Sequence, residues 1–306
     1  MSTPLVWLPF DPSLLGEPPA GLRYEVVVPD ELEVLPGSVS EVEFYVPSYG
    51  FSEVDVKAME KMTSLRVVQT QSAGVDHLRE HVPDGVLLCN GRGIHDASTA
   101  ELAMTLMLAS LRGIPGFVRA QDAHEWIHGT RPALADRTVL IVGYGAVGAA
   151  LERRLDGFET QVVRVARSER EGVHAMGDLP DLLPRADVVV LIVPLTDETR
   201  GLMDAEALAR MKDGALLVNV ARGPVVDTDA LVAELRSGRL CAALDVTDPE
   251  PLPAGHPLWD CPNLLVSPHV GGATSAMEPR AYRLVREQLE RYATGQPLVN
   301  VMSGDY

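Results

Sequence analysis

Residues 138–155 read Thr-Val-Leu-Ile-Val-Gly-Tyr-Gly-Ala-Val-Gly-Ala-Ala-Leu-Glu-Arg-Arg-Leu. The apolar run before the first glycine has the composition of a buried strand, and the residues after the last glycine suit a helix. Between them, Gly143 permits a tight turn, Gly145 lets the main chain approach a pyrophosphate, and Gly148 lets helix and strand pack closely. The phosphates then lie at the helix N-terminus, where free N–H groups and the positive end of the helix dipole converge. The stretch therefore predicts a dinucleotide-binding domain. Its candidate cofactor residues are Gly143, Tyr144, Gly145, Ala146, Val147 and Gly148.

A second domain is expected because the glycine motif begins only at Gly143, whereas a simple dinucleotide-binding domain would begin with it. At 306 residues, of which 46% are hydrophobic, the chain can bury two cores of ordinary domain size. Ahead of residue 96, short apolar runs alternate with segments that suit helices, which predicts a parallel, doubly wound sheet. The expected strands of this part lie at 5–8, 24–28, 43–46, 66–70 and 86–89.

The rest of the chain continues the same alternation. A long apolar helix with capping residues ahead of it is expected at 96–112, and a last helix at 280–294 could return the chain to the first domain. Further strands are expected at 138–142, 162–165, 188–193, 215–220, 242–245 and 264–267. We predict an α/β fold with two doubly wound parallel-sheet domains around a cleft. Residues 1–96 plus 281–306 would form a flavodoxin-like substrate domain, and residues 97–280 a Rossmann dinucleotide-binding domain.

Charge and cysteine content narrow the function classes. The 26 Lys and Arg against 43 Asp and Glu give a net charge of −17 without any basic block, which argues against a nucleic-acid or anionic-membrane surface and favours a small-molecule partner. Cys89, Cys241 and Cys261 are too few and too widely spaced for a disulfide framework or a zinc site, so we expect no metal and a reducing, cytoplasmic location. The N-terminus lacks the basic region of a secretory signal, and no apolar run approaches the roughly 20 residues of a membrane helix.

Eight motifs occur along the chain in a consistent order. They are Ser72-Ala-Gly-Val-Asp76, Thr99-Ala-Glu-Leu102, the glycine motif, Val193-Pro-Leu-Thr-Asp-Glu-Thr199, Asn219-Val-Ala-Arg-Gly223, Leu244-Asp-Val246, Glu250-Pro-Leu252 and Ser267-Pro-His-Val-Gly-Gly272. In these motifs the chain resembles the D-isomer-specific 2-hydroxyacid dehydrogenases, and among them the glyoxylate and hydroxypyruvate reductases, over nearly its whole length. The resemblance implies a catalytic trio of Arg222, Glu250 and His269.

The chemistry of 2-keto acid reduction suits this trio. Hydride reaches C2 while the carbonyl oxygen collects a proton, and His269 is suited to supply that proton near neutral pH. A carboxylate at Glu250 would favour the protonated ring and set its tautomer. Arg222 offers a planar fork that can hold the substrate carboxylate and polarise the adjacent carbonyl.

Asp245 and Asp248 compete with Glu250 for the place beside His269. Glu250 is preferred because the family places its glutamate immediately before this proline, at the offset it keeps from the strand-end Asp245. Asp245 is then expected to orient the nicotinamide carboxamide or to tune His269. The resemblance further implies cofactor contacts at Pro194, Thr199, Val220, Ala221, Asp245, His269 and Gly271.

Other candidates lie ahead of the glycine motif. The substrate carboxylate is expected to meet main-chain N–H groups around Ala73 and Gly74, since glycine lets main chain approach a ligand closely, and a simple turn is the alternative. Arg92 and His95 could face the cleft or the solvent. Trp126 is expected in a helical segment that the resemblance places at a dimer interface, with core packing as the alternative. A homodimer is expected from the resemblance alone.

The resemblance also narrows the reaction. Formate dehydrogenases of the superfamily pair the active-site histidine with glutamine, whereas this chain has Glu250. The chain ends at Tyr306, so the C-terminal regulatory domain of many phosphoglycerate dehydrogenases is not expected. The predicted function is NAD(P)H-dependent reduction of glyoxylate, hydroxypyruvate or a similar small 2-keto acid to the D-2-hydroxy acid. A phosphoglycerate dehydrogenase-like enzyme and a dinucleotide-sensing corepressor on the same scaffold remain open.

The residues after the second strand of the dinucleotide fold bear on the choice of cofactor. NAD-specific members place Asp or Glu about 20 residues beyond the glycine motif, where it accepts hydrogen bonds from the ribose 2′-hydroxyl. Here Arg167 stands in that place, and a guanidinium can bind a 2′-phosphate bidentately. Ser168 can add a donor and Arg170 positive charge, although Glu169 lies between them and Arg167 could instead stack on adenine without choosing a cofactor. NADP(H) is expected over NAD(H).

Overall fold

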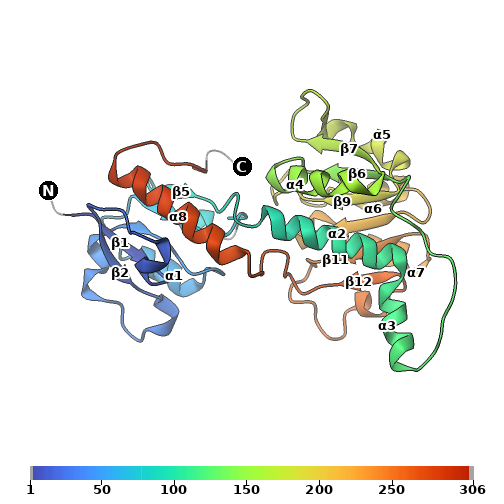
Figure 1. Cartoon of the computed structure of the whole chain (residues 1–306), viewed down its shortest axis with the longest axis horizontal. Coiled ribbons are helices and arrows are strands. Elements are labelled where there is room, and N and C mark those ends of the chain that lie inside the picture. Colours follow the sequence, from blue (N-terminus) through green and yellow to red (C-terminus); the bar gives the residue numbers. More distant parts are fainter. Residues whose placement is uncertain (1–2, 77, 303–306) are drawn as a thin grey trace. The chain divides into compact units, whose positions relative to one another are not determined.

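The computed structural model describes residues 3–76 and 78–302, which form two compact units (Figure 1). The first unit combines the described residues up to His95 with those from Ser275, and the second runs from Asp96 to Thr274. The predicted boundaries lay after residues 96 and 280. The later one differs because helix α8 (Met277–Ala293) begins before residue 280 and buries Val285 and Leu289 in the core of the first unit.

Five parallel strands form the sheet of the first unit in the order β2-β1-β3-β4-β5. They are β1 (Leu5–Leu8), β2 (Arg23–Val26), β3 (Val42–Tyr45), β4 (Val67–Gln69) and β5 (Leu87–Cys89). This is the strand order of flavodoxin-like folds. Successive residues of β1 point to opposite faces, so that Leu5 and Trp7 join one core cluster while Val6 and Leu8 join the other. Helix α1 (Glu53–Met59) packs into the first cluster and α8 into the second, so the sheet is covered on both faces, as predicted.

The buried side chain of Gln288 attaches α8 to the end of β4. Its Nε2 donates to Gln69 Oε1 at 2.6 Å and to the Val299 carbonyl oxygen at 2.8 Å, and its Oε1 accepts from the Val299 N–H at 2.9 Å. Buried amides are stable where their donors and acceptors are bonded. This network explains how the C-terminal segment returns to a sheet built from N-terminal residues.

Seven parallel strands form the sheet of the second unit in the order β12-β11-β10-β9-β6-β7-β8. They are β6 (Thr138–Val142), β7 (Gln161–Ala166), β8 (His174–Ala175), β9 (Val188–Leu191), β10 (Leu216–Asn219), β11 (Cys241–Leu244) and β12 (Leu264–Val266). The chain runs outward from β6 to β8, returns to β9 on the other side of β6, and runs outward again, which is the Rossmann arrangement. Only β8 was not predicted from the sequence, because two residues are too short to show a pattern.

Helices cover both faces of this second sheet. Val139 and Ile141 of β6 pack with α2 and α4, whereas Leu140 and Val142 join the cluster that contains residues of α6 and α7. The helices are α2 (Asp96–Arg112), α3 (Ile114–Asp122), α4 (Ala146–Leu155), α5 (Leu179–Leu182), α6 (Ala205–Arg210) and α7 (Thr228–Arg236). Short 3-10 helices lie at Pro12–Leu15, Pro29–Glu31, Gly37–Glu41, Arg79–His81, Asp156–Phe158, Met176–Asp178, Leu183–Arg185, Gly223–Val225 and Pro257–Asp260.

Helix α2 has the bounds that were predicted, but the prediction that Trp126 lies in a helix is wrong. Helix α3 ends at Asp122, and His124 takes a left-handed conformation with φ 56°, which an α-helix does not contain. Trp126 then lies in an irregular segment and is 96% exposed, so core packing is excluded as well. Within residues 3–76 and 78–302, no single helix is long and apolar enough to cross a membrane; only α2 and α3 taken together, with a 65° bend between them, meet that test of length and composition.

Candidate active site

The predicted site residues of the second unit lie beyond the carboxyl ends of its parallel strands. The glycine motif follows β6, Arg167 follows β7, Pro194 follows β9, Arg222 follows β10, Asp245 follows β11 and His269 follows β12. Open α/β sheets bind ligands at this edge, at the point where the strand order reverses. That point lies at β6, between β7 and β9.

The glycine motif has the geometry of a phosphate-binding turn. Gly143 has φ 105°, and a Cβ there would lie 2.5 Å from the main chain of Ile192. A Cβ on Gly148 would lie 2.8 Å from the Gly143 carbonyl oxygen, so the close packing of α4 requires glycine. Gly145 differs, because it is the N-cap of α4 and a Cβ there would meet no atom within 4 Å. This open side and the N–H groups at the start of α4 suit the pyrophosphate of a dinucleotide.

Tyr144, inside the glycine motif, is held by two arginines and a glutamate. The guanidinium groups of Arg164 and Arg170 lie 5.6 and 5.7 Å from its ring centroid. Arg170 also donates to the Tyr144 carbonyl oxygen at 2.5 Å, and the Tyr144 hydroxyl donates to Glu152. Hydrogen bonds from Arg164 lower the pKa of Glu152, and the bond to Glu152 raises the pKa of Tyr144. The charges of Arg164 and Glu152 therefore hold the turn in place at neutral pH.

Arg167 and Ser168 are exposed directly after β7, where a ligand can reach them. The chain then turns back within four residues, since the Arg170 N–H donates to the Val173 carbonyl oxygen at 3.1 Å and the Val173 N–H donates to the Arg170 carbonyl oxygen at 2.8 Å. This turn directs Arg170 towards Tyr144. Of the two arginines that the sequence had grouped together, Arg170 therefore contacts the glycine motif.

Thr199 shapes the turn after β9. Its hydroxyl donates to the Pro194 carbonyl oxygen at 2.6 Å and accepts from the Thr196 N–H at 2.9 Å. The side chain is buried, so its hydroxyl stabilises this turn. Pro194 and Thr199, which were predicted as cofactor contacts, are therefore linked directly.

Asn219, at the end of β10, shapes the turn that carries Arg222. Its Oδ1 accepts from the Ala221 N–H at 3.0 Å, and its Nδ2 donates to the Arg222 carbonyl oxygen at 2.9 Å. Val220 and Ala221 are buried, while the guanidinium of Arg222 is half-buried and donates to the Ala221 carbonyl oxygen at 2.8 Å. No role was predicted for Asn219. The available signal was an asparagine at a strand end, because its amide readily bonds main chain a few residues further on.

Asp245, at the end of β11, anchors the loop that carries His269. Its buried carboxylate accepts three hydrogen bonds, from Ser267 Oγ at 2.6 Å and from the Val270 and Gly271 N–H groups at 2.9 Å each. Its carbonyl oxygen accepts from the His269 N–H at 2.8 Å. A Cβ on Gly271 would lie 2.9 Å from Asp245 Oδ2, so the loop needs glycine there. Of the two roles predicted for Asp245, this geometry favours an effect on His269.

Glu250, rather than Asp245 or Asp248, lies against His269. Its Oε1 is 2.5 Å from His269 Nδ1, and both side chains are partly exposed. His269 has φ 53°, a conformation that is uncommon for a residue with a side chain, so the loop aims the ring at some cost in backbone strain. With Nδ1 on the carboxylate, Nε2 is the ring nitrogen that can exchange a proton with a ligand.

The predicted substrate residues of the first unit follow β4. Asn90 Nδ2 donates to the Ala73 carbonyl oxygen at 3.0 Å, and the Gly91 N–H donates to the Ser72 carbonyl oxygen at 2.7 Å. A Cβ on Gly91 would lie 2.6 Å from the Gln71 carbonyl oxygen, so this close contact requires glycine. These bonds use carbonyl oxygens of the loop, not the Ala73 and Gly74 N–H groups that were predicted to bind a carboxylate.

Arg92 and His95, grouped together in the sequence analysis, differ in the structure. Arg92 is exposed, whereas His95 is buried with its Nε2 2.8 Å from the Gln71 carbonyl oxygen and its ring centroid 5.3 Å from that of Tyr49. A solvated loop position is therefore excluded for His95. Among the residues that the structure describes, no group of three or more His, Cys, Asp or Glu side chains could hold a metal ion.

Comparison with known proteins gives consistent matches. Residues 104–271 match the family model of the D-isomer specific 2-hydroxyacid dehydrogenase, NAD binding domain. A glyoxylate reductase of Thermofilum pendens is 34% identical over 259 residues, which cover 80% of this chain and 76% of the relative.

Solved structures agree over nearly the full length. A D-isomer specific 2-hydroxyacid dehydrogenase of Xanthobacter autotrophicus in complex with NADPH and MES is 33% identical, with a TM-score of 0.84 and coverage of 99% of this chain and 98% of the other. An NADPH-dependent glyoxylate/hydroxypyruvate reductase of Sinorhizobium meliloti in complex with NADP and sulfate is 28% identical, with a TM-score of 0.82 and the same coverage.

The glycine motif leads to a first prediction. Gly145→Ala should keep the unfolding free energy of the parent protein, because the Cβ has open space, yet bind NADH and NADPH roughly tenfold or more weakly, since hydrogen bonds to charged groups contribute about 1.5–3 kcal/mol each. Urea unfolding and cofactor-fluorescence titration measure the two quantities. Gly148→Ala is the matched control and should instead lose about 1–3 kcal/mol of unfolding free energy through overpacking. Unchanged dinucleotide affinity in folded Gly145→Ala would contradict the assignment.

Proposed function

Because the chain belongs to the D-isomer specific 2-hydroxyacid dehydrogenase family, we propose that it reduces a small 2-keto acid to the D-2-hydroxy acid with a nicotinamide dinucleotide as hydride donor. The observation that carries this proposal is the 2.5 Å contact between His269 Nδ1 and Glu250 Oε1. It lies at the carboxyl edge of a Rossmann sheet whose glycine turn is open at Gly145. An acid–base pair and a dinucleotide site on one sheet edge are what hydride transfer coupled to protonation needs.

His269, Glu250 and Arg222 have different tasks in this reaction. Bound nicotinamide supplies the hydride. His269 donates a proton from Nε2 to the substrate carbonyl oxygen. Glu250 sets the tautomer that presents Nε2 to the substrate, and its negative charge stabilises the protonated ring. Arg222 holds the substrate carboxylate with its planar guanidinium, which the Asn219 turn positions. Binding of the same carboxylate by the Ala73 and Gly74 N–H groups stays a prediction.

The proposed substrate is glyoxylate or hydroxypyruvate, supported by the names of the relatives from Thermofilum pendens and Sinorhizobium meliloti. Cofactor oxidation with glyoxylate, hydroxypyruvate, pyruvate, phenylpyruvate and phosphohydroxypyruvate tests it. Turnover of phosphohydroxypyruvate alone would favour a phosphoglycerate dehydrogenase-like enzyme. Tight dinucleotide binding without turnover of any 2-keto acid would favour a sensing role and refute the proposed reaction.

We further propose NADPH as the preferred cofactor. Arg167 and Ser168 are exposed after β7, at the place where NAD-specific proteins carry a carboxylate. A carboxylate would repel the 2′-phosphate, whereas a guanidinium can bind it bidentately. The NADPH and NADP complexes of the two structural neighbours support the same choice.

We also propose a homodimer, formed through the segment around α3. This segment exposes Ile114, Val118, Trp126 and Ile127 to solvent, with Trp126 at 96%. Exposed apolar side chains that include a tryptophan are typical of protein–protein interfaces. A second copy of the chain is the expected partner.

The acid–base pair yields a second prediction. His269→Gln should lower kcat by about 10²–10⁴-fold, because it removes the proton donor, and should leave the Kd for NADPH near that of the parent protein. In Glu250→Gln, the alkaline limb of the kcat profile should move to lower pH. The reduction needs the protonated ring, and the variant lacks the charge that stabilises it. If His269→Gln keeps a kcat near that of the parent protein, His269 is not the proton donor. If the alkaline limb of the kcat profile does not move in Glu250→Gln, Glu250 does not act on His269.

The cofactor proposal is tested by a third prediction. Arg167→Asp should weaken NADPH binding roughly 10- to 100-fold while changing NADH binding little, because one or two charge-assisted bonds to the 2′-phosphate are lost. Fluorescence titrations give both dissociation constants. Arg153→Asp, on α4, is the charge-matched control and should leave the ratio of the two constants unchanged. A parent protein that prefers NADH would overturn the argument from Arg167.

The dimer proposal yields a fourth prediction. Trp126→Ser should raise the dimer dissociation constant roughly 30-fold or more, since a buried interface tryptophan contributes about 2 kcal/mol or more. Sedimentation velocity across a concentration series measures the change. Val34→Ser, an exposed apolar residue of the first unit, is the control and should not alter it. A parent protein that sediments as a monomer at micromolar concentration would contradict the proposal.

A further inference from the structure

The turn that carries Arg222 and the loop that carries Glu250 approach each other closely through main chain at Gly223. Gly223 is buried, and a Cβ on it would lie 1.9 Å from the Thr247 carbonyl oxygen and 2.7 Å from the Asp248 nitrogen. Only a residue without a side chain allows this approach. The main chain just after Arg222 therefore lies directly against the main chain just before Glu250.

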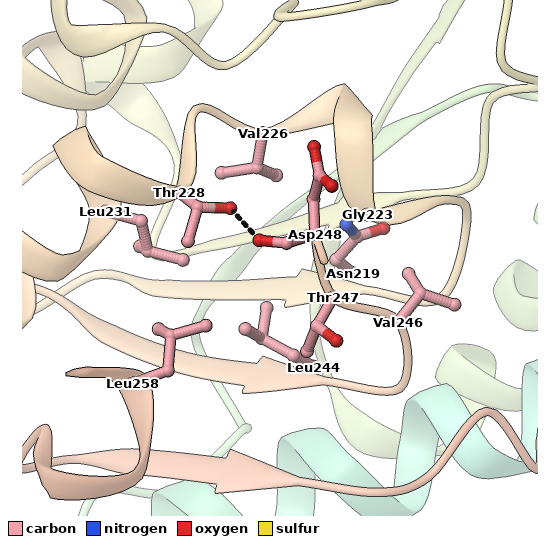
Figure 2. Close-up of a pocket in the computed structure, with 10 residues that line it drawn as sticks. All are labelled: Asn219, Gly223, Val226, Thr228, Leu231, Leu244, Val246, Thr247, Asp248 and Leu258. Carbon is pink, nitrogen blue, oxygen red and sulfur yellow. Dashed lines mark hydrogen bonds between the residues drawn. The ribbon is translucent and has the colours of Figure 1, made fainter. Parts of the chain in front are cut away.

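A second contact joins the same two segments. Thr228 Oγ1, at the first turn of α7, donates to the Asp248 carbonyl oxygen at 2.9 Å, as Figure 2 shows. Between the two contacts the chain is well fixed, because Val225 and Val226 are buried and the Val226 N–H donates to the Gly223 carbonyl oxygen at 3.1 Å. Residues 247 and 248 therefore contact both ends of the 223–228 segment.

A small pocket lies among these contacts (Figure 2). Its lining is mostly apolar and includes Gly223, Thr228, Thr247 and Asp248.

Hydrogen bonds within the loop link the position of Thr247 to that of the Glu250 carboxylate. Thr247 is buried, and its Oγ1 donates to the Pro249 carbonyl oxygen at 2.9 Å. The Thr247 N–H donates to Glu250 Oε2 at 3.4 Å, while Oε1 of the same carboxylate contacts His269. A shift of Thr247 would therefore shift the carboxylate relative to the His269 ring.

We propose that the 223–228 segment sets the position of Glu250 relative to Arg222, and that Gly223 and Thr228 are positioning residues for the reaction. This inference rests on the proposed reduction of a 2-keto acid. The substrate carboxylate held by Arg222 and the proton held on His269 must meet the same small molecule. A direct mechanical link between the two loops keeps the distance between them constant.

Thr228→Val tests the link, because it keeps the shape of the side chain and removes the bond to Asp248. We expect kcat with the best keto acid to fall roughly tenfold, since a misplacement of about 1 Å can cost about 100-fold in rate and the loss of one hydrogen bond should move Glu250 by less. The pH profile of kcat should also change, because Glu250 loosens from His269. The Kd for NADPH should stay unchanged. Thr228→Ser keeps the hydroxyl, so it should have the kcat and the pH profile of the parent protein.

Thr105→Val is the matched control, since Thr105 Oγ1 also donates one 2.9 Å bond to a carbonyl oxygen, that of Glu101 in the exposed part of α2. It should leave kcat and its pH profile at parent values. Gly223→Ala should have a larger effect than Thr228→Val and should also raise the KM for the keto acid, because the added Cβ pushes the Arg222 turn away from Thr247. If Gly223→Ala does not fold, Thr228→Val and Thr228→Ser still test the positioning role.

The outcomes separate this inference from the proposed function. A parent protein that reduces no 2-keto acid would refute the reaction and with it the positioning role. An active parent with a Thr228→Val variant that behaves like Thr105→Val would refute the positioning role alone. A Thr228→Val variant that loses thermal stability but keeps the parent pH profile would show a purely structural hydroxyl and also overturn the inference.

Discussion

The buried carboxylate of Asp245 is the constraint on which the geometry of the site depends. It accepts hydrogen bonds from Ser267, Val270 and Gly271, and so holds a loop whose central residue, His269, is in a left-handed conformation. Bonds to an ionised acceptor are stronger than neutral ones, and a buried charge without partners is costly, so the carboxylate and the loop stabilise one another. These bonds help to compensate the strained backbone that turns the His269 ring towards Glu250.

Two other buried polar side chains hold loops in the same way along the carboxyl edge of the second sheet. Asn219 fixes the turn after β10 through two bonds to main chain, and Thr199 fixes the turn after β9 in the same way. Each is a buried polar side chain close to a strand end whose partners lie in the loop it controls. A site assembled from several loops needs each loop to be rigid by itself, because errors in position accumulate when the reacting groups come from different strands. The edge of the sheet brings the loops together, and these polar side chains fix the conformation of each loop.

Two kinds of glycine serve this site for different reasons. Gly143, Gly148, Gly223 and Gly271 are required because a Cβ would strike neighbouring main chain or a carboxylate, so they bring parts of the protein together. Gly145 has open space around its missing side chain, so the protein itself does not require glycine there. The ligand does. Gly143 and Gly148 are thus needed for the packing of the protein, whereas Gly145, in the same motif, is not.

Much of the architecture follows from local patterns in the amino-acid order. Apolar runs and turn residues predicted the strands apart from β8, and α2 was predicted with its observed bounds, because burial of a strand or helix face imposes a short-range repeat on the chain. The same kind of pattern marked the glycine turn and the motifs of Arg222, Glu250 and His269. Trp126 was wrongly expected in a helix because the left-handed turn at His124 leaves no sequence repeat to detect. Folding was needed to show that Glu250 and not Asp248 meets His269, that Asp245 holds the histidine loop, that Arg170 binds Tyr144, and that Gly223 lies on Thr247. These contacts join residues far apart in the chain whose side chains have no common period, so only the pairing of the strands brings them within bonding distance.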